Sequence, residues 1–253
     1  MSEPASRPDH GAVPPSAGTD EPEVGHEHPD VTGGWLRPAV FGAMDGLVSN
    51  FALIAGMVGG TGGDSHRTVV LAGVAGLAAG AFSMAAGEYT SVASQSEFAQ
   101  AQIDIERDEI ADNDEAERAE LTATYVDKGL TPALAAQVAA QVHSDIDNAV
   151  RVHAREEFGV TEGDLASPFL AAVSSFVAFA VGASVPVLPY LLGAATLLAA
   201  VLMSMVGMFV CGAVVTAVTR RSWWYGGLRH LVLGGAAAAL TYAVGSAVGT
   251  GLG

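Results

Sequence analysis

Long apolar stretches alternate with polar segments along this chain, and the apolar stretches predict its main elements. Four stretches exceed the roughly 20 apolar residues that one helical crossing of a bilayer needs, and a fifth is shorter but adequate. The long ones cover residues 38–60, 68–93, 188–218 and 227–251, and the short one covers residues 168–186. No barrel-like alternation is present, so only helices can satisfy the backbone in lipid. The pattern therefore predicts five transmembrane helices.

The boundary between the third and fourth predicted helices is marked by Pro186 and Pro189 in the segment GASVPVLPY. Proline breaks helices because it lacks the backbone N–H, so we expect a tight turn at this segment. Within the helices, glycines recur four residues apart, a spacing that lets two helices approach closely. These pairs are Gly42/Gly46, Gly56/Gly60, Gly76/Gly80 and Gly245/Gly249.

Basic residues flank the predicted helices unevenly, and this bias predicts their orientation. Arg37 precedes the first helix, and Arg220, Arg221 and Arg229 lie between the last two. Both segments are therefore expected in the cytoplasm, with the N-terminus inside and the C-terminus outside a cell membrane. The polar region between the second and third helices, residues 97–164, is then cytoplasmic as well.

Charge is concentrated in that polar region. Of the 253 residues, 50% are hydrophobic and 15% are charged, whereas residues 97–164 hold 17 Asp and Glu against 5 Lys and Arg. Such an acidic balance favours cations as partners and argues against nucleic acid. We therefore expect a disordered acidic tail, two transmembrane helices, a cytoplasmic helical metal-binding domain and three more transmembrane helices. Their ranges are 1–34, 35–96, 97–164 and 165–253.

The acidic region carries pairs of glutamates at helical spacing. Glu106 and Glu109 are three residues apart, as are Glu117 and Glu120, so each pair lies on one helix face. In one continuous helix the two pairs would be about 16 Å apart and could not share an ion. The intervening sequence ADNDEA, however, favours a turn near residues 112–114. Such a turn would let the two pairs face each other across a helical hairpin.

A third element of this region offers His153 and Glu157, four residues apart and so on one helix face. Carboxylates with one imidazole suit divalent iron, manganese or zinc. The same acids also fit an ordinary solvated helix surface, and spacing alone does not decide between the two interpretations. Lys128 is the only lysine, which excludes a P-loop and hence a nucleotide site of that kind.

One acid lies inside a predicted transmembrane helix: Asp45, in the stretch FGAMDGLVSNFALIAG. A charged side chain near the middle of a bilayer costs at least ~2.5 kcal/mol, so an acid at this depth indicates a functional site. Met84 and Glu88 in the second helix are four residues apart and share a face toward its cytoplasmic end. The three side chains would supply carboxylate and thioether groups along an ion path.

Several of these motifs together resemble the vacuolar iron transporter family. The resemblance rests on DGLVSNFALIAG, AGAFSMAAGEYTSVASQ, the two glutamate pairs and HAREEFGV, and it extends over roughly residues 35–251. It implies a five-helix homodimer that exports Fe²⁺, and often Mn²⁺, in exchange for protons along the dimer interface. By position it assigns a metal and proton site in the membrane to Asp45 and Met84. It assigns the cytoplasmic metal site to Glu106, Glu109, Glu117, Glu120 and Glu157.

The chain departs from plant-type members of that family at two places. His153 and Ala154 stand where those members have a methionine pair, so an imidazole is expected to replace thioether ligands. Gly76 stands where they have an acid, and we expect Glu88 to take over part of its role. Both changes bear on metal preference, and Zn²⁺ and Co²⁺ remain possible cargoes beside Fe²⁺ and Mn²⁺.

The sequence thus predicts a proton-coupled exporter of divalent metal, not an enzyme, with the metal collected by the acidic domain. Three alternatives stay open. A divalent-metal channel would use the same helices without proton exchange. A membrane-anchored di-iron oxidase would need Glu-x-x-His on two helices, and the only such match is Glu23 to His26 in the tail. A metal sensor would need no acid inside the membrane.

Overall fold

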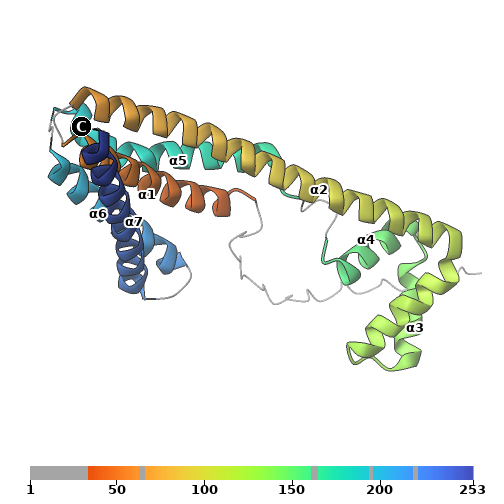
Figure 1. The fold of residues 1–253 in the computed structure, drawn as a ribbon. Helices are drawn as coiled ribbons and strands as arrows, with labels where there is room; N and C mark the ends of the chain where they lie inside the picture. The colour runs from red at the N-terminus through yellow and green to blue at the C-terminus, as the bar shows by residue number, and fades with distance from the viewer. Residues whose placement is uncertain (1–33, 63–65, 161–164, 194–195, 219–221, 253) are drawn as a thin grey trace, which may run out of the picture. The chain divides into compact units, whose positions relative to one another are not determined.

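The computed structural model describes residues 34–62, 66–160, 165–193, 196–218 and 222–252. Within these ranges the chain forms seven helices and no strand (Figure 1). The helices are α1 (Leu36–Thr61), α2 (His66–Asp127), α3 (Pro132–Val142), α4 (Ile146–Glu157), α5 (Pro168–Leu191), α6 (Leu197–Val218) and α7 (Trp223–Leu252). The predicted disordered tail, except Gly34, and the basic residues Arg220 and Arg221 lie outside the described residues.

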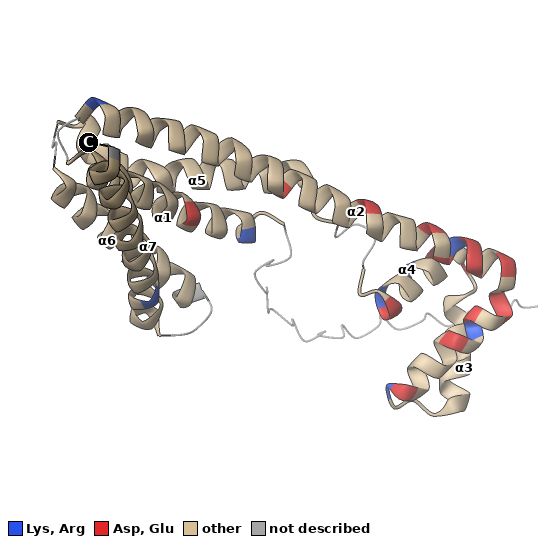
Figure 2. Cartoon of the chain, viewed as in Figure 1, with Lys and Arg blue, Asp and Glu red and all other residues tan. Residues whose placement is uncertain are grey.

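Five of the helices, α1, α2, α5, α6 and α7, are long and apolar enough to cross a membrane, which confirms the predicted number. Residues 168–218, which include α5 and α6, contain no charged residue. The acidic positions gather instead along the second half of α2 and around α3 and α4 (Figure 2). The 62 residues of α2 therefore include both a membrane span and much of the acidic region. The boundary predicted at residue 97 falls inside this helix.

Helix α1 organises the membrane-spanning part, since it packs against α2, α5, α6 and α7. Leu47 and Phe51 of α1 are buried with Met208 of α6 in one apolar cluster. The predicted close approaches are confirmed at three of the four glycine pairs: for example, a Cβ added to Gly46 would overlap the backbone of α5, and one added to Gly245 would overlap the backbone of α1. At the fourth pair, Gly76 and Gly80 meet side chains of α1 and α5 instead. Small residues thus let neighbouring helices touch through their main chains.

The turn predicted at Pro186 and Pro189 is wrong, because α5 continues through both prolines to Leu191. The chain turns instead at Gly193, whose φ of 87° suits glycine, and α6 begins at Leu197 rather than at residue 188. Prolines are tolerated inside transmembrane helices where neighbouring helices hold the segment. Here Val187 and Tyr190, beside the prolines, are buried against α1, α2 and α6.

The break predicted in the acidic region is confirmed at Asn113, whose φ of −147° and ψ of 59° interrupt the helical geometry of α2. Beyond the kink, α3 begins with Pro132 at its first turn, and α4 is capped by Asp145, which accepts a 3.0 Å hydrogen bond from the Asp147 N–H. Apolar residues then fix α4 on α2. Ile103 and Ile110 of α2 are buried against Ala149, Val150 and Ala154 of α4.

Candidate metal sites

The packing of α4 on α2 brings three predicted ligands together. Glu106 comes from α2, before the kink, and His153 and Glu157 come from α4. Their ligand atoms all lie within 4.8 Å of one another, which is close enough for one ion to contact all three. We call this group the Glu–His–Glu cluster. His153 is fully buried and Glu106 is 1% exposed, so the cluster is not an ordinary solvated helix face.

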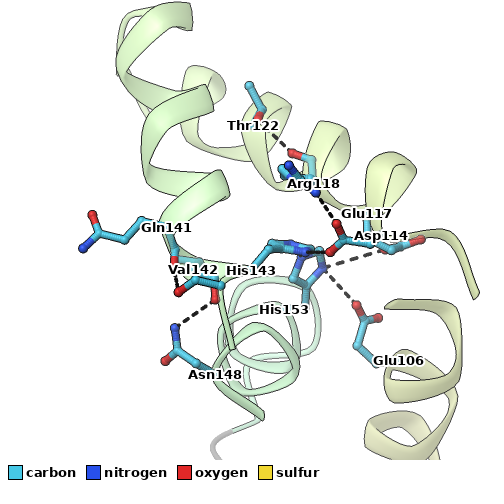
Figure 3. Close-up of polar contacts among 11 residues, drawn as sticks. Glu106, Asp114, Glu117, Arg118, Thr122, Gln141, Val142, His143, Asn148 and His153 are labelled. Carbon is cyan, nitrogen blue, oxygen red and sulfur yellow. Dashed lines mark hydrogen bonds and ion pairs between the residues drawn. The ribbon is translucent and has the colours of Figure 1, made fainter. Parts of the chain in front are cut away.

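The Nδ1 atom of His153 is the centre of the Glu–His–Glu cluster. It lies 2.9 Å from Glu106 Oε1 and 3.0 Å from Glu157 Oε1. Glu117, beyond the kink at Asn113, comes within 3.9 Å of the same nitrogen (Figure 3). The kink therefore brings one glutamate of each predicted pair, Glu106 and Glu117, close to His153. Glu109 and Glu120 are exposed on α2 and are not members of the cluster.

The buried Glu106 carboxyl is poorly compensated. Its Oε1 has no hydrogen-bond donor among the described residues, although His153 Nδ1 lies 2.9 Å away. Burial raises the pKa of Glu106 to about 7, and the charges of Glu157, Glu117, Glu109 and Glu120 add to this effect. The pKa of Glu117 is also raised, mainly by burial. A cation in the cluster would relieve both the desolvation and the repulsion between carboxylates.

Stability of the metal-free protein should fall as pH rises, because the folded state holds the Glu106 proton more tightly than the unfolded state. This contribution is fully present below pH 4.5 and is lost as pH rises through about 7. Its size is ~3 kcal/mol. Thermal unfolding of the metal-free protein between pH 5 and 8 measures it. The Glu106→Gln variant, which cannot ionise there, should lack this part of the decline, and equal declines would contradict the assignment.

Two residues beside the cluster were not singled out from sequence. His143 follows α3, and its Nε2 lies 3.0 Å from His153 Nε2, while its Nδ1 lies 2.7 Å from Asp114 Oδ1 (Figure 3). The His143 side chain is 1% exposed. Asp114 also accepts a hydrogen bond from Arg118, and these two partners lower its pKa, His143 contributing most. No helical spacing links His143 to His153, because a turn separates α3 from α4.

In the membrane-spanning part, Asp45 and Met84 line one groove of about 380 Å³ between α1, α2 and α5. Asp45 accepts a 2.8 Å hydrogen bond from Ser49 Oγ and is otherwise open to this groove. Glu88 is half-buried but is not among the residues that line it. The groove therefore pairs a carboxylate with a thioether, a combination that can hold a divalent transition-metal ion.

The groove wall also contains the polar residue Asn50, which the sequence did not mark as a site residue. Its amide donates to the carbonyl oxygens of Gly73, at 3.1 Å, and Ala183, at 2.7 Å. Because both donated bonds go to main-chain oxygens of neighbouring helices, Asn50 ties α1 to α2 and α5 at the level of the groove. The contact of Ser49 with Asp45 could be predicted from their spacing of four residues on one helix. No pattern in the sequence predicts the hydrogen bonds of Asn50 to the other two helices.

Five membrane-spanning helices with a polar groove and a Glu–His–Glu cluster, in which Glu106 and His153 are buried and Glu157 is exposed, define a multi-pass membrane protein with two candidate cation sites. A sequence model described as the VIT family matches residues 36–246, and the chain belongs to this family. Its members found by comparison are transporters and not enzymes, as the sequence predicted.

Three relatives show how far the similarity extends. The chain is 38% identical to a vacuolar iron transporter of Acanthamoeba castellanii, over 72% of this chain and 69% of the relative. It is 33% identical to vacuolar iron transporter homolog 1 of Oryza sativa subsp. japonica, over 83% of this chain and 72% of the relative. It is 27% identical to vacuolar iron transporter 1 of the same plant, over 97% of this chain and 99% of the relative.

Proposed function

We propose that this protein exports ferrous iron from the cytoplasm in exchange for protons and also carries manganese. The observation that carries the proposal is that α2 supplies a residue to both candidate sites, Met84 to the groove and Glu106 to the Glu–His–Glu cluster. The relatives named as iron transporters support iron as the main cargo. Zinc and cobalt are further cargoes that the same ligand types accept.

In the proposed mechanism the cytoplasmic acids collect the metal ion and the groove passes it across the membrane. Glu109, Glu117 and Glu120 raise the local concentration of cations around the Glu–His–Glu cluster, and Glu88 lies on α2 between the cluster and the groove. Asp45 and Met84 then hold the partly dehydrated ion. A carboxylate binds either a metal ion or a proton, so protonation of Asp45 from the outer side releases the metal. This competition couples the two fluxes.

We further infer that two copies of the chain form the transport unit in a cell membrane, with residues 97–164 in the cytoplasm. The groove that holds Asp45 is open on one side, and large apolar side chains beside it are exposed: Phe41 is 61% and Phe82 is 68% exposed. A second copy packed against this face would close the groove along the interface. Cross-linking of single cysteines on this face measures whether the two copies meet there.

Transport by the wild-type protein tests the proposal directly. Purified protein in vesicles should take up Fe²⁺ when a pH gradient is imposed, and a pH-sensitive dye inside the vesicles should report proton movement in the opposite direction. Mn²⁺, Zn²⁺ and Co²⁺ in parallel vesicles rank the cargoes. Electrogenic metal flux that does not depend on pH would identify a channel. The absence of any metal flux would favour the alternative of a membrane-anchored metal sensor.

A further inference from the structure

His143 and Asp114 form a chain of contacts that reaches His153 at Nε2, the ring nitrogen that does not face Glu106 and Glu157 (Figure 3). Asp114 Oδ1 lies 2.7 Å from His143 Nδ1, and His143 Nε2 lies 3.0 Å from His153 Nε2. His153 Nδ1, on the other side of its ring, faces Glu106 and Glu157. We propose that His143 and Asp114 are positioning residues that fix the tautomer of His153, so that His153 Nδ1 binds the metal.

The order of donors and acceptors along this chain begins at Asp114. An ionised carboxylate accepts only, and Asp114 already accepts a hydrogen bond from Arg118, so His143 Nδ1 must carry the proton that it donates to Asp114. A neutral imidazole has one donor nitrogen and one acceptor nitrogen. His143 Nε2 is therefore the acceptor, and it takes its hydrogen from His153 Nε2.

The remaining nitrogen, His153 Nδ1, is then left with a lone pair. A histidine ligates a metal as the neutral ring, so this is the state that matters for binding. His153 Nδ1 lies 2.9 Å from Glu106 Oε1 and within hydrogen-bond geometry, at 3.0 Å, of Glu157 Oε1, so without an ion a proton shared with a carboxyl group occupies the place that the metal would take. Ligand atoms about 2.1 Å from one ion lie roughly 3.0–3.4 Å apart. The two distances from His153 Nδ1 are already close to this range, and all three ligand atoms lie within 4.8 Å of one another.

Residues behind a metal ligand commonly set its orientation and its tautomer, and their loss weakens metal binding about 10–100-fold. Here the supporting pair comes from two other segments, the end of α3 and the kinked part of α2, whereas His153 belongs to α4. Both imidazole side chains are essentially buried, with 1% exposed for His143 and 0% for His153, so no bulk water competes for the bond between them.

A matched pair of variants separates positioning from packing. His143→Leu fills the space but neither accepts nor donates, and we expect it to weaken Zn²⁺ binding by the full-length protein about 10–100-fold. His143→Gln offers an amide oxygen to His153 Nε2–H and an N–H to Asp114, and it should bind Zn²⁺ nearly as the wild type does. Calorimetric titration measures both. Equal binding by the Leu variant and the wild type, or equal losses in the two variants, would overturn the inference.

Nitrogen NMR of protein labelled with ¹⁵N at its 7 histidines provides an independent measurement that does not depend on the leucine variant. Zn²⁺ should move the Nδ1 signal of His153 to the metal-bound range and leave His143 with a protonated Nδ1. The signals are assigned by their loss in His143→Gln and His153→Gln. Zinc on the Nε2 atom of either ring would overturn the inference.

This inference rests on the proposed function only in that the cluster binds metal. The experiments can therefore contradict the positioning role and the transport function independently. Vesicles that show no iron uptake, together with zinc on His153 Nδ1 and rescue by glutamine, would defeat transport and keep the positioning role. Proton-coupled iron uptake with zinc on Nε2 would do the reverse.

Discussion

Replacing Asp45 by asparagine is expected to abolish proton-coupled iron uptake into vesicles while the protein remains folded. The amide keeps the size of the carboxyl and can still accept the hydrogen bond from Ser49, but it supplies no charge to a dehydrated cation. Asp45 is exposed in one copy of the chain, but the proposed interface would bury it, and removing one partner of a buried charge pair costs ~3–5 kcal/mol. Each ~1.4 kcal/mol is a factor of ten in occupancy, so the uptake rate should fall at least ~100-fold.

Ser49→Ala is the matched control for this experiment. It removes the 2.8 Å hydrogen bond to Asp45 and leaves the carboxylate in the groove, so uptake should persist with a smaller change in rate. Thermal unfolding of both variants shows that folding is intact. Proton-coupled uptake that survives in Asp45→Asn would contradict the competition between metal and proton at this site.

The second large effect is expected at Glu106. The Glu106→Gln substitution removes the most buried carboxylate of the Glu–His–Glu cluster and should weaken metal binding by at least ~100-fold, because the metal loses a desolvated charged ligand. Binding of Mn²⁺ and Zn²⁺ is measured by calorimetry on the full-length protein. The measurement uses the Asp45→Asn background, so that the groove does not contribute.

Glu115→Gln is the control for the Glu106 variant, since it makes the same change of charge on α2 at an exposed position. Glu115 is not among the residues that raise the pKa of Glu106. It should therefore leave the affinity nearly unchanged. Equal losses in the two variants would indicate that the acidic segment attracts cations only through its overall charge.

Much of the fold follows from local sequence. The five spans could be predicted because each needs only a long apolar stretch, and the interruption at Asn113 could be predicted because Asn and Asp favour turns. The prediction of a turn at Pro186 and Pro189 was wrong because tertiary packing, and not the local sequence, decides the structure there. The packing of Val187 and Tyr190 against three other helices keeps the segment helical, and no local rule contains that packing.

The contacts in the candidate sites also divide into those that the local sequence predicts and those that depend on tertiary packing. Pairs within one helix, such as His153 with Glu157, are visible from their spacing. Contacts between helices are not: His143 reaches His153 across a turn, and Asn50 bonds to α2 and α5. The sequence therefore showed which residue types are available for metal binding, and the packing of α4 on α2 determined which of them meet.

The unbroken course of α2 between Met84 and Glu106 has a mechanical consequence. These residues are separated by 22 positions, or about 33 Å of helix, and the only described departure from helical geometry in α2, at Asn113, lies beyond both. A helix of this kind transmits rotation about its axis as a stiff rod does. In the proposed mechanism, a rotation of α2 about its axis that moves Met84 in the groove would also move Glu106 relative to His153, so this helix would couple the two candidate sites.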